Sequence, residues 1–274
     1  MVNMGNVWDR ATEFLSDNLS AIVPIALFAI FLPQSLQSNL QPLARLAPTA
    51  TVVIDIIWCI AAIVSLWGQI AIIAFAIDPA AGRVTAIQMA NKRVASAVGI
   101  KLLMVLAAVL LIAPIGVAMG LAGFDFAAAM AGSEQDLPSG VAGFIALYIL
   151  ALTALVCWLV ARLALIYPVI VWERRGIGAL RRSVVLTRGI AWKVIGVMIL
   201  FGVVAGVAII AAQFVFGSIL RLAMGGKGDI SVATVLTSVL VGAVITAFIV
   251  LFSAFIAKLY LAVRDRRESI VESA

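Results

Sequence analysis

The chain of 274 residues is 65% hydrophobic and 12% charged, and its mean hydropathy is +1.21. This composition excludes a soluble globular protein and predicts an all-α polytopic membrane protein. The sequence has no histidine, and its two cysteines lie inside apolar runs, so we expect no enzyme activity, no cofactor and no metal site. We assign the net charge of +6 to topology and to anionic lipid, and we expect no nucleic-acid partner.

Residues 1–17 predict an amphipathic helix that lies at the membrane interface. Val7, Trp8, Ala11 and Phe14 recur at helical spacing, and charged residues occupy the positions between them. Acidic residues outnumber basic ones ahead of the first apolar run, so we do not expect a cleaved signal peptide.

Residues 18–262 contain six apolar windows that reach or approach the length needed to cross about 30 Å of hydrocarbon. These windows are 20–36, 51–77, 98–124, 141–167, 194–224 and 232–261. Pro24 and Pro33 fall in the first window, so we expect that span to be kinked or partly re-entrant. The predicted fold is therefore a helical bundle with about six transmembrane helices, followed by a tail at 263–274.

Most of the 19 lysine and arginine residues fall on one side of these windows. By the positive-inside rule, both termini and the loops around Arg83 and Arg181 are cytoplasmic, and the loop 125–139 faces outward. We expect a bacterial cytoplasmic (inner) membrane as the location. The loop segments 84–90 and 177–183 occupy corresponding places and follow similar apolar exits. An internal duplication and a convergent loop composition both explain that similarity.

Residues 178–183 read Gly-Ala-Leu-Arg-Arg-Ser and are followed by Leu186-Thr187-Arg188-Gly189 and by Trp192-Lys193. Together they resemble the signature loop of the glycerophosphoryl diester phosphodiesterase membrane domain family, and the similarity is sharpest over 162–196. The resemblance implies six spans and no catalysis within them, because in that family a separate soluble barrel performs the reaction. The chain ends at Ala274 and lacks the histidines which that chemistry uses, so we expect the membrane module alone.

The same basic segment, 171–193, supplies the candidate contacts to anionic lipid or to a protein partner at the cytoplasmic face. They are Arg174, Arg175, Arg181, Arg182, Arg188 and Lys193. In a continuous helix, residues seven apart would form two arginine stripes beside an apolar stripe of Ile177, Leu180 and Val184. Leu186 breaks this pattern, and the glycines nearby favour breaks in the helix. Topology alone and docking of lipid or protein are both open interpretations.

Polar residues are few within the apolar windows. The candidates are Asp55, Gln69, Arg162, Gln213 and Lys258. Arg162 and Lys258 lie near helix ends, where their side chains can reach the interface.

The glycine pairs Gly116/Gly120 and Gly202/Gly206 have the spacing that permits close helix contact, which we expect within the chain rather than in a dimer.

Three function classes follow from these features. We predict a non-catalytic integral membrane protein that contacts lipid or docks a partner. A transporter or channel for a small solute or lipid is the first alternative, and it requires Asp55 or Arg162 to line a polar path. A membrane enzyme acting on lipid is the second, and it requires acidic or nucleophilic residues that converge at one depth.

Overall fold

A computed structural model describes residues 3–46, 51–130, 132, 138–174, 176–224 and 231–272. Arg175 and residues 131 and 133–137 of the expected outward loop lie outside this part. The described secondary structure is entirely helical. It comprises α1 (Met4–Asp17), α2 (Leu19–Ala26), the π-helix η1 (Leu27–Phe31), α3 (Leu32–Leu46), α4 (Thr51–Ile77), the 3₁₀ turn η3 (Pro79–Ala81), α5 (Gly82–Leu121), α6 (Phe126–Met130), α7 (Ser139–Leu163), α8 (Ile166–Trp172), α9 (Gly178–Leu186), α10 (Ala191–Met224) and α11 (Val232–Glu272).

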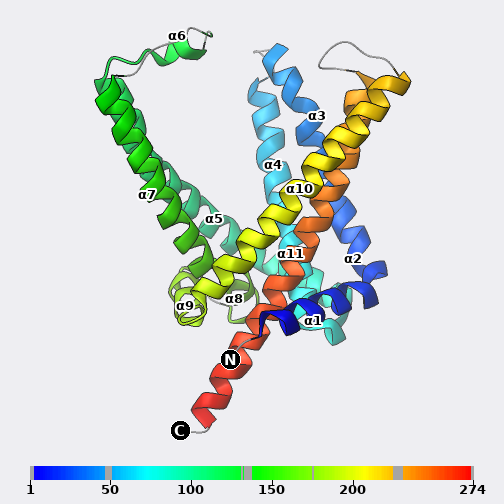
Figure 1. Ribbon diagram of the computed structural model, residues 1–274. Coiled ribbons are helices and arrows are strands. Elements are labelled where there is room, and N and C mark those ends of the chain that lie inside the picture. Colours follow the sequence, from blue (N-terminus) through cyan, green and yellow to red (C-terminus); the bar gives the residue numbers. More distant parts are fainter. Residues whose placement is uncertain are drawn as a thin grey trace.

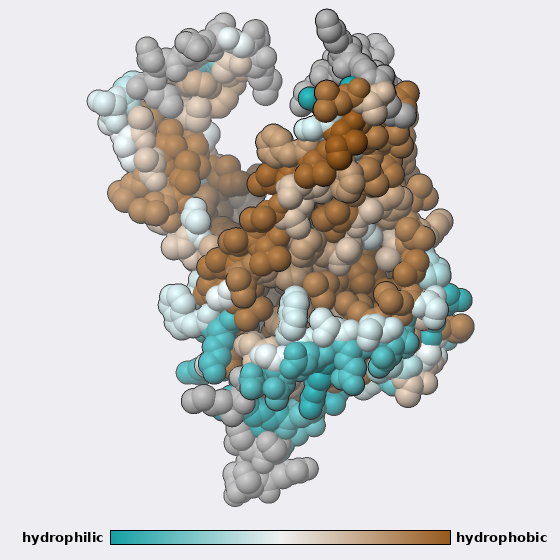
Figure 2. Space-filling model, turned by 45° about the vertical axis from the view of Figure 1, so that its right-hand side comes forward, coloured by the Kyte–Doolittle hydropathy of each residue, from teal (hydrophilic) through white to brown (hydrophobic). Residues whose placement is uncertain are grey.

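Six stretches of this chain are long and apolar enough to cross a membrane, which confirms the prediction of an all-α bundle with about six spans. They are Leu19–Leu40, Thr51–Ile77, Pro79–Leu121, Ser139–Trp172, Ala191–Ala223 and Val232–Glu268. Both termini lie at the same end of the bundle (Figure 1). Hydrophilic residues gather at that end beneath a broad apolar surface (Figure 2). We call this end the basic face and the opposite end the far face.

Helix α1 lies across the basic face and packs against α11 (Figure 1). Its N-terminus is capped by Asn3, whose side chain accepts a hydrogen bond from the Gly5 amide. The buried residues Val7, Ala11 and Phe14 form the predicted apolar stripe. The amphipathic helix is therefore present, and its apolar side is covered by the rest of the protein.

The first span is one path built from three helical segments, α2, η1 and α3. The π-helical segment directly precedes Pro33, and the amide of Leu32 donates to the carbonyl of Leu27, five residues back. Proline has no amide hydrogen to continue the regular pattern, which accounts for an irregular turn just before it. Beyond Pro33 the helix continues to Leu46 and reaches the far face, so this segment is long enough to cross a membrane (Figure 1).

Helix α4 crosses the π-helix at unusually close range. A Cβ atom on Gly68 would lie 2.5 Å from the Cβ of Ala29, a distance that no side chain can occupy. Gly68 is thus the glycine that permits close helix contact. A Cβ atom on Gly116, Gly120, Gly202 or Gly206 would meet no described atom within 4 Å. The prediction of close packing at those two pairs is therefore wrong.

The core lies mainly near the basic face. In the most apolar 18-residue stretch of α4, 61% of the residues are buried, whereas none is buried in the corresponding stretch of α5. Helices α5 and α7 lean together away from α10 and α11, and Figure 2 shows an open notch between the two arms. The bundle is therefore joined tightly at one end and spread at the other.

Candidate functional site

The basic segment folds as two short helices joined by a reversal, so the break that its glycines favoured is present and the two arginine stripes of a continuous helix do not form. Helix α8 ends at Trp172, Arg174 adopts a positive φ of 54°, and α9 begins at Gly178. A left-handed residue ends an α-helix because it turns the backbone out of the helical path. Gly189, with φ 89°, makes a second turn before α10.

The apolar face of α9 also differs from the expected one. Ala179, Ser183 and Leu186 are buried, whereas Ile177 is 74% exposed and Leu180 and Val184 are only partly buried. Leu186 did not fit the expected apolar stripe, but it belongs to the side of α9 that is buried. Helix α9 starts at Gly178 and presents a different side to α7 from the one expected.

Arg162 joins α7 to α9 and has a structural role. Its carbonyl, left unpaired at the end of α7, accepts hydrogen bonds from the hydroxyls of Ser183 at 2.8 Å and Thr187 at 3.2 Å. Its guanidinium donates to the carbonyl of Val184 at 3.2 Å and lies 5.2 Å from the centre of the Trp158 ring. Arg162 therefore fastens α9 and does not line a path through the bundle.

Arg182 is likewise engaged within the protein. Its Nε lies 2.9 Å from Oε1 of Glu173, and the hydroxyl of Tyr260 donates to the same oxygen at 3.3 Å. These contacts tie α9 to α8 and α11. Arg181, Arg188 and Lys193 are exposed on the basic face, so the six predicted contact residues do not form one surface.

Arg174 lies in a pocket of about 350 Å³ between the start of α5 and the end of α8. The lining consists of Thr85, Gln88, Met89, Lys92 and Arg93 from α5, with Val171, Trp172 and Arg174. Three cations and two neutral polar side chains line this cationic pocket, and no carboxylate does. Within the described residues, no ion pair is found for Lys92, Arg93 or Arg174.

Sequence reasoning missed Lys92 and Arg93 as site residues. The signal was present, since Thr85, Met89 and Arg93 follow at intervals of four and Gln88 and Lys92 form the neighbouring stripe. The sequence alone shows that one side of a helix carries these groups. It does not show that Arg174 faces them, because that depends on the reversal after α8.

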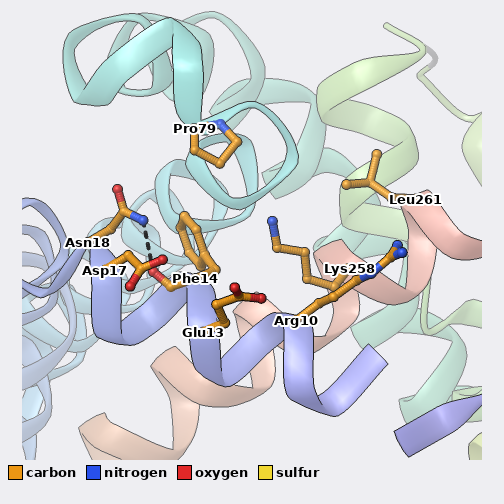
Figure 3. Close-up of a pocket in the computed structure, with 8 residues that line it drawn as sticks. All are labelled: Arg10, Glu13, Phe14, Asp17, Asn18, Pro79, Lys258 and Leu261. Atoms are coloured by element: carbon orange, nitrogen blue, oxygen red, sulfur yellow. Dashed lines mark hydrogen bonds between the residues drawn. The ribbon is translucent and has the colours of Figure 1, made fainter. Parts of the chain in front are cut away.

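Lys258 lies in a second pocket at the basic face, shown in Figure 3, whose volume is about 320 Å³. Its amine donates to the carbonyl of Ala76 at 2.8 Å and lies 4.7 Å from the centre of the Phe14 ring. Arg10 and Glu13 of α1 border the same pocket. A cation at the carbonyl end of α4 is favourable because unpaired carbonyls concentrate negative potential there. Lys258 thus reaches the interface as predicted and closes the end of α4.

The remaining polar candidates occupy separate places. Asp55 is exposed near the far end of α4, and the amide of Gln69 donates to the Ser65 carbonyl of its own helix at 3.3 Å. Gln213 lines a cavity of about 600 Å³ between α3, α10 and α11. The transporter alternative required a path lined by Asp55 or Arg162, and the two residues lie toward opposite faces.

One protein family, described as a domain of unknown function (DUF7847), matches residues 6–266, which include the first five spans, the sixth up to residue 266, and the pockets around Arg174 and Lys258. No curated protein and no solved structure matches the chain. The description of the matching family does not mention the glycerophosphoryl diester phosphodiesterase membrane domain, so that resemblance stays a prediction. Because the match covers most of the chain, the chain belongs to the DUF7847 family.

Proposed function

We propose that this multi-pass membrane protein is a non-catalytic module that binds anionic phospholipid headgroups in the cationic pocket between α5 and α8. The observation that carries the proposal is the pocket's charge: Lys92, Arg93 and Arg174 border it without a carboxylate in the lining. A phosphodiester would neutralise part of this charge.

The polar groups suit a phosphate. Arginine presents paired N–H donors that match two phosphate oxygens, and each basic residue near an anionic membrane surface contributes about 1 kcal/mol. Gln88 and Thr85 add neutral hydrogen-bonding groups, and Trp172 places an aromatic ring where interfacial rings commonly lie. By the positive-inside rule, we place this face on the cytoplasmic side of a bacterial inner membrane.

Two further features support a module without chemistry of its own. Glu173, an acidic side chain at the basic face, fastens helices through Arg182 and Tyr260. The resemblance of 162–196 to the glycerophosphoryl diester phosphodiesterase membrane domain also implies a part of the protein that does not catalyse.

The test compares two double variants with the same change in charge. Arg93→Gln with Arg174→Gln removes two cations from the cationic pocket, and Arg181→Gln with Arg188→Gln removes two exposed cations from α9 and the turn that follows it. We expect the first pair to weaken binding of phosphatidylglycerol about tenfold or more, since charge-assisted hydrogen bonds contribute roughly 1.5–3 kcal/mol each. The second pair should have a much smaller effect.

Binding is measured by native mass spectrometry of the purified full chain during titration with phosphatidylglycerol, with phosphatidylcholine as the neutral comparison. Equal losses for the two double variants would mean that net charge alone attracts the lipid, and the pocket would then have no specific role. Thermal unfolding of each variant without added lipid establishes that the fold is intact.

A further inference from the structure

The first span contains an unusually polar stretch just after Pro33. Gln34, Ser35, Gln37, Ser38 and Asn39 follow within the segment that spans the membrane. Two of these side chains fasten α3 to its neighbours. Gln37 donates to the Trp58 carbonyl of α4 at 3.4 Å, and the hydroxyl of Ser238 on α11 donates to the Asn39 side chain at 3.0 Å.

Ser38 faces a cavity of about 600 Å³ toward the far face, which we call the far cavity. Its lining is Ser38 from α3, with Ile209, Gln213, Phe214, Gly217, Ser218 and Arg221 from α10, and Thr234, Thr237, Ser238, Val241, Gly242 and Ile245 from α11. Seven of these side chains carry a hydroxyl, an amide or a guanidinium group, and none carries a carboxylate.

The far cavity extends deep into the span. Gln213, Gly217 and Arg221 follow at intervals of four along one side of α10. At 1.5 Å per residue, Gln213 lies roughly 16 Å from the end of α10 at Met224, which is about half of a 30 Å hydrocarbon core. The polar lining therefore extends from the end of α10 about a third of the way along this 34-residue helix.

Polar groups such as Gln213 are unfavourable when they face lipid tails, whereas Arg221 lies three residues before the end of α10, where its side chain can reach the interface. Within the described residues, Arg221 makes no hydrogen bond or ion pair. No hydrogen bond to another described residue is found for the side chains of Gln213 and Ser218 either, and both line the same cavity. These groups fit a cavity that admits a polar ligand.

We propose that the far cavity binds the phosphate ester of a polyol. The phosphate would lie against Arg221, and the hydroxyls would bind Gln213, Ser218 and the neighbouring hydroxyl side chains. The single cation in the lining matches the one charge of a phosphodiester and would neutralise part of the charge of a free phosphate monoester, whereas the cationic pocket offers three cations. This site is independent of the proposed function, because it lies on the other face and is built from other helices.

Such a ligand has two sources, the headgroup of phosphatidylglycerol in the adjacent leaflet or free glycerol phosphate in the aqueous phase. The probe is Ser218→Cys in a chain that also carries Cys59→Ala and Cys157→Ala. The protein is reconstituted into phosphatidylcholine vesicles and labelled with a water-soluble thiol reagent. We expect rapid labelling, because a cysteine in a wet cavity ionises and reacts. Val207→Cys, exposed on the apolar side of α10, serves as the unreactive comparison.

If the ligand is the lipid headgroup, phosphatidylglycerol in the vesicles should slow labelling of Ser218→Cys. If the ligand is the free solute, added glycerol phosphate should slow it instead. Arg221→Gln should weaken either protection about tenfold, which corresponds to one charge-assisted hydrogen bond. Arg181→Gln removes a charge from the basic face and should leave protection unchanged. Ser139→Cys, at the start of α7, should be labelled equally with and without ligand.

Phosphatidylmethanol, which has the same charge but no headgroup hydroxyl, should protect less than phosphatidylglycerol. Equal protection by the two lipids would refute recognition of a polyol. Failure of both ligands to protect, or protection that survives Arg221→Gln, would overturn the site altogether. Thr234→Cys provides a second probe in the same lining if Ser218→Cys does not fold, as judged by size-exclusion chromatography.

Discussion

Equally apolar residues are buried near one end of this bundle and exposed toward the other. Near the basic face, Ile72 of α4 is fully buried among helices, whereas Ile112 in the outer part of α5 is 55% exposed. Lipid tails are as apolar as isoleucine, so helices in a membrane gain little from hiding apolar surface and associate through close packing and hydrogen bonds. The difference shows that hydropathy identifies the spans but does not determine which of them pack together.

Polar contacts between helices follow the same division. At the basic face, α4, α7, α8, α9 and α11 are linked through Lys258, Arg162 and Glu173. The arm formed by α5 and α7 has a link of its own, in which the hydroxyl of Tyr148 donates to the Leu111 carbonyl at 2.7 Å. The arm is thus held together internally while its outer part leans away from α10.

The largest expected effect comes from truncating the matched isoleucines. Ile72→Ala should lower the free energy of unfolding by about 2–3 kcal/mol, because it leaves a cavity among packed helices. Ile112→Ala should change it by less than about 0.5 kcal/mol, since lipid fills the space. The measurement is unfolding by sodium dodecyl sulfate in mixed micelles. Similar losses would show that another surface covers the outer part of α5 under those conditions.

The close contact between Gly68 of α4 and Ala29 of the π-helix tests the contrast between packed and open parts of the bundle with a smaller change in side-chain size. Gly68→Ala should destabilise the protein by about 1–2 kcal/mol, because its methyl group must displace Ala29 or the backbone of the π-helix. Gly116→Ala should be neutral or slightly stabilising, since a methyl group there meets open space and alanine favours a helix. The thermal midpoints of the two variants in one detergent provide the comparison. A tolerated Gly68→Ala would mean that the two helices separate readily.

The smallest of these effects on stability is expected at the ion pair between Glu173 and Arg182 at the basic face. Glu173→Gln removes the ion pair with Arg182, and we expect a loss of about 1 kcal/mol because Arg182 keeps partial contact with water. A double-mutant cycle with Arg182→Gln isolates the interaction between the two side chains. A coupling energy near zero would show that this pair does not contribute to the packing of α9.

The spans were predictable from the sequence because a long apolar run has few alternatives in lipid. The first and last residues of the helices were harder to predict. Helix α5 begins at Gly82, well before the expected window at 98–124, and the window at 141–167 divides between α7 and α8. Hydropathy cannot detect these limits, because a polar segment can continue a helix into water and a short apolar turn can interrupt one.

The candidate sites were predictable only in part. The basic composition of 171–193 located Arg174, but its partners Lys92 and Arg93 come from a helix distant in sequence. Gln213 was noted as one polar residue in an apolar run, and its significance depends on the polar stretch of α3 that faces it with α11. Which surfaces meet is a tertiary property, and a single sequence contains no direct measure of it.

The continuity of α5 has a mechanical consequence. Between Arg93 at the cationic pocket and Pro114 near the far face, the helix is an unbroken rod roughly 30 Å long. A tilt of 10° at its basic end would move the other end by roughly 5 Å, and α7 would travel with it through Tyr148. A ligand contact that tilted α5 at the cationic pocket would therefore change the width of the notch toward the far face.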